Sequence, residues 1–159
     1  MAEGTSIVND SAILISTFVL GEAAFGIDTA QIQEVVRAGD ITPVHQAPDF
    51  VVGVMNLRGR ISTVIDLAVK LELGGVAAGL DNRIFIIEWQ GEQVGLLVDK
   101  VTDALTVELN TVKPAPENVH GVQGRFFKGV CYAGNRLIAL LDLTAILQLE
   151  DERRLIGSK

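Results

Sequence analysis

Apolar residues along the chain come in short runs that are separated by glycine, proline and polar residues. Runs such as residues 12–20 and 83–89 are rich in β-branched and aromatic side chains, which favour strands. Many short strands with Gly- and Pro-containing turns between them are typical of small barrels and not of a parallel α/β sheet. The pattern therefore predicts a mostly β fold.

The same order of elements occurs twice along the chain. Residues 50–73 and 127–149 each contain two apolar strands that flank a Gly-containing turn, which predicts a β-hairpin in both. Gly53 aligns with Gly129, and the Ile-Asp-Leu at 65–67 with the Leu-Asp-Leu at 141–143. Upstream, a hairpin predicted at 18–27 matches one at 85–97. This order indicates an internal duplication.

The duplication predicts two small five-stranded barrels within one bilobed domain at residues 12–149. Its repeat halves cover about 12–78 and 82–149, with the glycine-rich segment 74–81 between them. Residues 1–11 are expected to be a flexible tail, and 150–159 a charged tail.

Short helices complete the predicted fold. Asp66 and Asp142 each precede an apolar-periodic segment, where a carboxylate caps free backbone N–H groups. Asp28 and Thr29 stand at an expected N-cap, and residues 31–37 are predicted to form a short helix or helical turn. Residues 101–105 are the corresponding segment of the second half.

Composition excludes several classes of partner and site. The 159 residues are 48% hydrophobic and carry a net charge of -7, which disfavours nucleic acid and anionic lipid. No leader-like segment or membrane span of ~20 apolar residues is evident, so we expect a soluble, cytoplasmic protein without direct membrane insertion. The lone Cys131 is interpreted as a buried hydrophobic residue.

No constellation of residues indicates catalysis. A Walker-type phosphate loop is absent, Ser62 and Thr63 have no nearby base, and His45 and His120 have no metal-ligand neighbours at suitable spacing. We interpret both histidines as exposed loop residues. The sequence thus predicts a protein that is not an enzyme, with no metal or cofactor.

Two features have open interpretations. Arg58, at the predicted tip of the first hairpin, is either a solvated turn residue or a guanidinium presented to a partner. The apolar residues of the segments near 32 and 101 either belong to the core or line a groove for a partner helix. They are Ile32, Val35, Val36, Val101, Ala104 and Leu105.

Several motifs together resemble the CheW family of chemotaxis coupling proteins, from about residue 17 to 149. They are FGID at 25–28, IQEVVR at 32–37, GVMNLRG at 53–59, VIDL at 64–67 and KPAPE at 113–117. The resemblance implies two intertwined SH3-like five-stranded barrels. It also implies an adaptor that couples methyl-accepting chemoreceptor tips to the regulatory domain of the histidine kinase CheA.

The resemblance also implies where the partners bind. Receptor contact would involve Ile32, Gly53, Arg58 and Val101. Kinase contact would involve Glu34, Val36, Asp40 and Ile41, and a further contact within receptor arrays would involve Pro116, Glu117 and Asn118.

The sequence departs from the family pattern at several positions, and other functions remain alternatives. Thr63 replaces a usual proline, and Asn118 a common aromatic; residues 45–48 form a looser version of the family's proline loop. The alternatives are a CheW-type scaffold of a non-flagellar chemosensory pathway, a kinase regulatory domain or CheV fragment, and a small β-barrel ligand carrier or enzyme.

Overall fold

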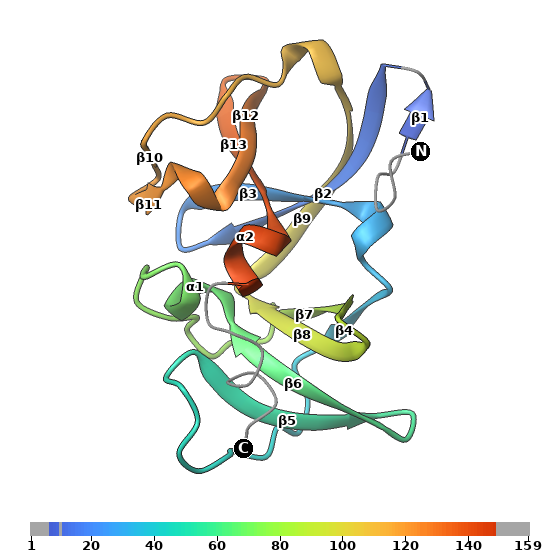
Figure 1. Ribbon diagram of the computed structural model, residues 1–159, viewed down its shortest axis with the longest axis vertical. Helices are drawn as coiled ribbons and strands as arrows, with labels where there is room; N and C mark the ends of the chain where they lie inside the picture. Colours follow the sequence, from blue (N-terminus) through green and yellow to red (C-terminus); the bar gives the residue numbers. More distant parts are fainter. Residues whose placement is uncertain (1–6, 10, 149–159) are drawn as a thin grey trace.

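Two β-sheets make up most of the computed structural model, which describes residues 7–9 and 11–148 (Figure 1). Sheet A contains β1 (Ile7–Asn9), β2 (Ala12–Leu20), β3 (Ala23–Asp28), β9 (Lys100–Glu108), β12 (Phe127–Ala133) and β13 (Arg136–Leu141). Sheet B contains β4 (Glu34–Arg37), β5 (Val51–Leu57), β6 (Arg60–Asp66), β7 (Arg83–Trp89) and β8 (Glu92–Val98). The predicted mostly β fold is confirmed.

Short helical elements and one small hairpin connect these strands. The α-helices are α1 (Leu67–Lys70) and α2 (Leu143–Gln148), and the 3-10 turns are η1 (Thr29–Gln31), η2 (Leu109–Thr111) and η3 (Gly124–Phe126). Strands β10 (Asn118–Val119) and β11 (Val122–Gln123) pair only with each other. The glycine-rich segment 74–81 contains no helix or strand.

Each sheet takes strands from both sequence halves. Sheet B has the order β4-β7-β8-β6-β5, so β7 and β8 of the second half lie between strands of the first. Apart from β1, sheet A has the order β9-β2-β3-β13-β12. This is the same arrangement, except that here β2 and β3 of the first half lie between strands of the second. Parallel pairs, β6 with β8 and β13 with β3, join the halves. Neither half can therefore complete a sheet alone.

The two repeated hairpins are alike in detail. Both β5–β6 and β12–β13 have a register shift at the glycine near the start of the first strand, Gly53 or Gly129. Thr42 bridges to Val54 next to one glycine, and Lys113 bridges to Val130 next to the other. The hairpins and the glycine correspondence predicted from the duplication are thus confirmed, while closure of each sheet into a barrel stays a prediction.

The predicted helical segments at 31–37 and 101–105 are wrong, because both regions form strands. Asp28 does cap a single 3-10 turn, η1, by accepting a hydrogen bond from the Ala30 N–H at 2.9 Å. The chain then turns into β4, whose residues pair with the edge of β7, while 101–105 lies in β9 along β2. The unpaired edges of β7 and β2 supply backbone partners, and these override a spacing compatible with a helix.

Strand register also fixes the correspondence between these two segments. Leu20 pairs with Ala23 and Trp89 with Glu92, so the hairpins align at their turns and Thr17 corresponds to Ile86. Asp103 lies opposite Thr17 and Glu34 opposite Ile86, so Glu34 corresponds to Asp103 and, two residues earlier, Ile32 to Val101, as the sequence pattern predicted.

The core consists of one large apolar cluster and two smaller ones. The large cluster includes Phe18, Phe25 and Phe85 together with buried residues of both helices, so it unites the two sheets. The ring centroids of Phe18 and Phe85, which come from different sheets, are 5.3 Å apart. One smaller cluster belongs to sheet A, around Ile15 and Cys131, and the other to sheet B, around Met55 and Val64.

The structure describes part of the predicted N-terminal tail and none of the predicted C-terminal tail. Within the segment predicted as a tail, Ile7–Asn9 forms β1 and pairs antiparallel with β2. The predicted charged tail at 150–159 lies outside the described residues. Among the described helices, none has the length and apolar character needed to span a membrane.

The predicted caps at Asp66 and Asp142 are confirmed. Asp66 Oδ1 accepts from the Val69 N–H and Asp142 Oδ1 from the Ala145 N–H, both at 3.1 Å. Asp66 Oδ2 also accepts from the Val76 N–H at 2.9 Å, which ties the glycine-rich segment to α1.

We expect Asp66→Ala to lower the free energy of unfolding by about 2 kcal/mol and Asp142→Ala by about 1 kcal/mol, because between these two carboxylates only that of Asp66 accepts from a second backbone N–H within residues 11–148. Urea unfolding of the two variants tests this order. A larger loss for Asp142→Ala would contradict the assignment of the second bond.

Candidate functional site

Arg58 lies at the tip of the β5–β6 hairpin, as predicted. Leu57 pairs with Arg60, so Arg58 and Gly59 form a two-residue turn, with φ of 53° and 84°. Positive φ at both positions is the geometry of a type I′ turn, whose twist matches that of the flanking strands. The Asn56 side chain accepts a hydrogen bond from the Gly59 N–H at 2.9 Å and stabilises the turn. The guanidinium thus extends from a well-defined hairpin.

Arg58 forms a bidentate ion pair with Glu34 of β4. Nη2 lies 2.5 Å from Oε2, and Nη1 donates to Oε1. Because β4 and β5 are the two edge strands of sheet B, the pair connects opposite edges of the sheet. The Arg58 side chain is nevertheless 69% exposed and that of Glu34 27% exposed. The ion pair therefore presents a flat, charged surface to solvent.

The ion pair shifts both pKa values. The hydrogen bond from Arg58, together with its positive charge, lowers the pKa of Glu34 below its ordinary value of 4.5, and Glu34 raises the pKa of Arg58. A lowered carboxylate pKa stabilises the folded state above the ordinary pKa, and this contribution is lost as pH falls through the lowered value.

We expect an NMR titration of the Glu34 carboxylate to give a pKa below 4.5 in the wild type and a higher one in Arg58→Ala. Arg60→Ala removes a neighbouring exposed charge without breaking the pair and serves as the control. Equal Glu34 pKa values in wild type and Arg58→Ala would contradict the ion pair in solution.

The duplication offers an internal comparison for this ion pair. In sheet A, Ala133 pairs with Arg136, so the turn equivalent to Arg58-Gly59 is Gly134-Asn135. Asp103, opposite Thr17, occupies the position equivalent to Glu34, opposite Ile86. A glycine offers no cation to this aspartate and so cannot form the pair, yet sheet A has the same strand order. The shared architecture therefore does not require the ion pair, which favours the partner-binding interpretation of Arg58.

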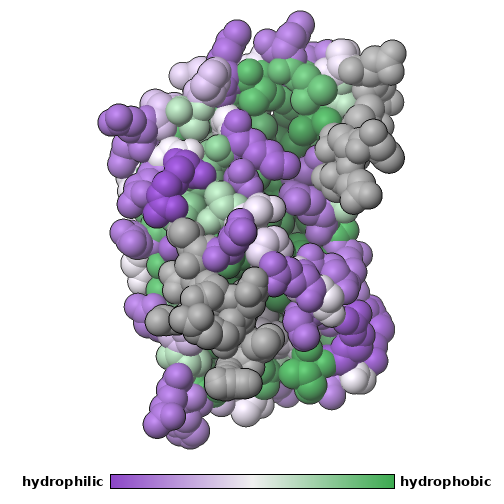
Figure 2. Space-filling model, viewed as in Figure 1, coloured by the Kyte–Doolittle hydropathy of each residue, from purple (hydrophilic) through white to green (hydrophobic). Residues whose placement is uncertain are grey.

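The apolar residues expected to line a receptor groove are only partly exposed to solvent. Ile32 and Val101 are both partly buried and pack against the large core cluster. On the strands of sheet B, the large apolar side chains that are exposed are instead Val35 on β4, at 42%, and Ile61 on β6, at 59%. On the face shown in Figure 2, hydrophobic residues reach the surface in separate patches among hydrophilic ones.

Gly53 is buried and so is not itself a contact surface. A Cβ at this position would lie 2.2 Å from the carbonyl oxygen of Thr42, and the glycine has a φ of 156°. Its role is to let residues 41–43 cross β5 closely, where Thr42 and Val54 exchange backbone hydrogen bonds of 2.8 Å. Any effect of Gly53 on binding is indirect, through the position of this crossing segment.

The residues expected to contact the kinase come from β4 and the segment that follows it. Val36 and Ile41 are partly buried and pack against the sheet B cluster, while Asp40 is exposed. Glu34, expected on the kinase side, bonds directly to Arg58, expected on the receptor side. The two expected surfaces therefore meet at one pair of side chains.

The residues expected at an array contact lie together on the connection between β9 and β12. Pro116, Glu117 and Asn118 are exposed, and the Asn118 side chain accepts from the Gly121 N–H at 3.1 Å. Gly124 packs directly under them, since a Cβ there would lie 1.8 Å from the Pro116 carbonyl oxygen. Thr63 lies within β6, paired with Val54 and Val94, so the extended backbone expected at this departure is confirmed.

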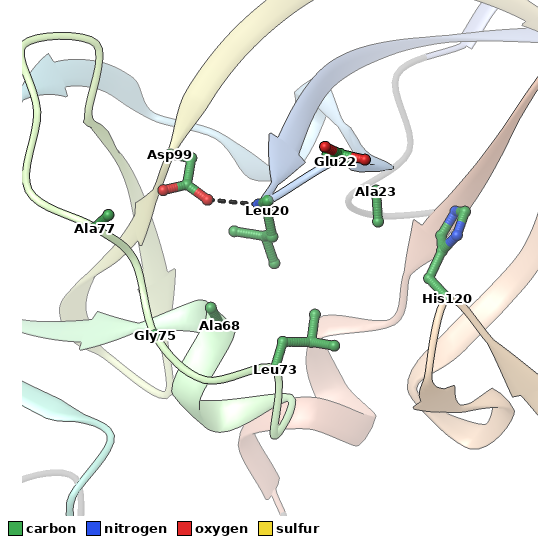
Figure 3. Close-up of a pocket in the computed structure, with 10 residues that line it drawn as sticks. Leu20, Glu22, Ala23, Ala68, Leu73, Gly75, Ala77, Asp99 and His120 are labelled. Atoms are coloured by element: carbon green, nitrogen blue, oxygen red, sulfur yellow. Dashed lines mark hydrogen bonds between the residues drawn. The ribbon is translucent and has the colours of Figure 1, made fainter.

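The histidines occupy different environments. His45 is exposed, as predicted, but His120 is partly buried at the β10–β11 turn, with its ring 5.4 Å from that of Phe25. His120 also borders a cavity of about 480 Å³, which Figure 3 shows with Glu22 and Asp99 on its other sides. Asp99 accepts from the Gly21 N–H at 2.6 Å. Among residues 7–9 and 11–148, no group of His, Cys, Asp and Glu is arranged to hold a metal ion.

Neither buried nucleophile is suited to reaction. Ser62 is fully buried, and its hydroxyl donates to Gln93 at 2.5 Å. Cys131 is buried in the sheet A cluster, as predicted, and burial raises the pKa of its thiol, which disfavours the reactive thiolate.

Comparison with known proteins agrees with the motifs and the fold. The CheW-like domain family matches residues 15–151. The chemotaxis protein CheW of Klebsiella aerogenes is 33% identical over 84% of this chain and 81% of its own length, and the Thermotoga maritima CheW is 34% identical over 84% and 87%. The crystal structure of the scaffolding protein TtCheW from Thermoanaerobacter tengcongensis has a TM-score of 0.80 and 30% identity, covering 89% of this chain and 91% of its own.

These matches define the class of the protein: a CheW-like domain with two sheets and short helices. The chain belongs to the CheW family, as the motifs indicated, and is a scaffold protein of chemotaxis. Protein FrzA of Myxococcus xanthus, 28% identical over 86% of both chains, is a further relative.

Proposed function

We propose that this chain is a non-catalytic adaptor that couples the cytoplasmic tips of chemoreceptors to the regulatory domain of the histidine kinase CheA. It acts in the cytoplasm and is recruited to membrane receptor arrays. Receptor contact involves Arg58 and Val35 on sheet B, together with Ile32 and Val101, which pack against the large core cluster shared by the two sheets. Kinase contact involves Glu34 and the segment from Val36 to Ile41.

The observation that carries this proposal is the Arg58–Glu34 ion pair. Its charged groups lie on a hairpin turn and an edge strand, remain open to solvent, and have no counterpart among the described residues of sheet A, where Gly134 occupies the position of Arg58. Guanidinium and carboxylate groups in fixed positions can exchange their mutual bonds for bonds to a partner, which gives geometric specificity. Pro116, Glu117 and Asn118 then provide a separate contact between neighbouring complexes in an array.

A pull-down with an immobilised receptor cytoplasmic tip tests the proposal. The tip should retain the chain by itself, and it should retain CheA only when the chain is present. Retention of CheA in equal amount without the chain, or no retention of the chain, would contradict an adaptor role.

A further inference from the structure

Two arginines lie directly opposite each other on the neighbouring strands β4 and β7 of sheet B (Figure 1). Arg37 is the last residue of β4, and its partner Arg83 is the first residue of β7. Opposite residues of an antiparallel pair project from the same face of the sheet, with Cβ atoms about 5 Å apart. Like charges in this arrangement repel each other and destabilise the pairing. The stability of the sheet therefore gives no reason for two arginines here.

Both guanidiniums have hydrogen-bonding capacity to spare. Within the part of the chain that the structure describes, no carboxylate forms an ion pair with either arginine, although the whole chain has a net charge of -7. Arg83 Nη1 donates to the carbonyl oxygens of Leu80 at 3.0 Å and Asn82 at 2.8 Å, which holds this guanidinium in place and leaves Nε and Nη2 for another acceptor. Arg37 is exposed at the edge of the sheet. A fixed guanidinium and an exposed one beside it can bind a single oxyanion together.

The duplicate sheet shows that the fold does not need these cations. When the hairpins are aligned at their turns, Leu14 of β2 is equivalent to Arg83, and its partner Thr106 of β9 is equivalent to Arg37. An apolar side chain and a hydroxyl thus occupy these positions in sheet A, which has the same strand order. The arginine pair is therefore particular to sheet B, which favours a binding role.

Strand alternation places this pair on the same face of sheet B as Val35. Arg37 and Val35 project from one face of β4, whereas Glu34 and Val36 project from the other, where Val36 packs against the sheet B cluster. Arg37 lies within the segment proposed for kinase contact, but its side chain is on the opposite face from that of Glu34. The arginine pair therefore adjoins the apolar side chain proposed for receptor contact.

The same face continues toward sheet A. Val35 lies opposite Phe85, whose ring centroid is 5.3 Å from that of Phe18, and Phe18 in turn lies opposite Val101. Val35 and Val101, on the edge strands β4 and β9, thus flank one pair of buried rings. Along β4, Val35 and Arg37 are two residues or about 6.6 Å apart. This matches the rise of about 6 Å between residues i and i+4 on one side of a helix.

Charge selects the group that the arginine pair would bind. An anion placed between two guanidiniums offsets their repulsion, whereas an ammonium or guanidinium adds to it and an amide has no charge to offset it. The carboxylate of Asp or Glu is the anion that unmodified protein side chains supply at neutral pH. It also accepts hydrogen bonds from guanidinium groups in a bidentate manner.

We infer that Arg37 and Arg83 bind the carboxylate of a glutamate or aspartate on the receptor-tip helix. That residue lies one helical turn from the apolar residue that contacts Val35. The inference rests on the proposed receptor contact and extends it to two residues that were not assigned to that surface. Arg37 and Arg83 thus determine which receptor helices bind, at a place separate from the Arg58–Glu34 ion pair.

The affinity of the full chain for a receptor cytoplasmic tip, measured by calorimetry at several NaCl concentrations, tests this inference. We expect Arg37→Gln to weaken binding about tenfold at low salt and to reduce the salt dependence of the affinity. Lys128→Gln removes an exposed cation from β12 of sheet A and should change neither quantity. Arg37 is the residue to change, because Arg83 also supports the turn at 79–82.

A stability measurement and a charge reversal complete the test. Because Arg37→Gln removes the repulsion between like charges, its melting temperature should equal or exceed that of the wild type. Each Asp and Glu of the tip is then replaced by Lys in turn. One of these altered tips should bind the wild type poorly and should bind Arg37→Glu more tightly than the unaltered tip does.

Several results would overturn the inference. They are equal affinity of wild type and Arg37→Gln for the tip, a lower melting temperature of Arg37→Gln, no altered tip that Arg37→Glu prefers, and a loss of affinity for the CheA regulatory domain in place of the tip. Failure of the wild type to bind the tip would contradict the adaptor role itself. A wild type that binds no better than Arg37→Gln leaves that role intact and removes only the arginine site.

Discussion

Arg58→Glu is expected to weaken binding to the receptor tip or to CheA at least about a hundredfold while the protein stays folded. The substitution replaces the guanidinium with a carboxylate beside Glu34, so like charges meet where the bidentate pair now lies. The fold should tolerate this, because the equivalent hairpin of sheet A has Gly134 at the turn and forms without such a pair. Calorimetric binding and thermal melting followed by circular dichroism measure the two effects separately.

Two variants sharpen this prediction. Arg60→Glu changes the charge of an exposed neighbour that lies outside the ion pair, and it should weaken binding far less. The double variant Glu34→Arg, Arg58→Glu restores an ion pair, but it exchanges the positions of the positive and negative charges that a partner would meet. Restored binding in the swap would assign Arg58 a purely internal role, and unchanged affinity in Arg58→Glu would make it a solvated turn residue.

Gly53→Ala is expected to lower the free energy of unfolding by about 3 kcal/mol. The new Cβ would lie 2.2 Å from the Thr42 carbonyl oxygen and 2.7 Å from its carbon, and these are backbone atoms that cannot rotate away. The φ of 156° adds strain for any residue with a side chain. Relief requires moving residues 41–43 off β5 and losing the paired hydrogen bonds between Thr42 and Val54.

Matched glycine variants test this cause. A Cβ at Gly39 would meet no atom within 4 Å, so Gly39→Ala should change stability little. Gly129→Ala, in the duplicate hairpin, should also destabilise, because its Cβ would lie 2.6 Å from the Lys113 carbonyl oxygen. Similar unfolding midpoints in urea for Gly53→Ala and Gly39→Ala would contradict the close approach at Thr42.

Local signals explain what the sequence could predict. The β5–β6 turn depends on Asn56 and Gly59, which are within one turn of each other, and the helix caps depend on Asp66 and Asp142 directly before their helices. Such features are decided by a few adjacent residues and the backbone conformations they favour. The duplication then placed the second hairpin by analogy with the first.

Strand pairing between distant segments was beyond the same reasoning. Ile32, Val35 and Val36 are spaced as on a helix, and nothing nearby in sequence indicates that β7, some fifty residues later, provides an open edge for β4. For the same reason the exchange of hairpins between sheets came from the family resemblance and not from the residue pattern. β-propensity depends strongly on tertiary context, which a single short segment does not contain.

The site was predictable in part for similar reasons. Arg58 could be placed at a hairpin tip, but its partner Glu34 lies 24 residues earlier on another strand. The family resemblance assigned these two residues to different binding surfaces, whereas the structure joins them in one ion pair.

The most direct test of the adaptor role is the amount of CheA held by an immobilised receptor tip as the concentration of this chain is raised. An adaptor with one site for each partner should first increase the retained CheA and then decrease it, because excess chain occupies tip and kinase separately. With Arg58→Glu, the retained CheA should stay low at every concentration of the chain. CheA retention that is independent of the chain, or that stays at its plateau at high excess, would contradict the proposal.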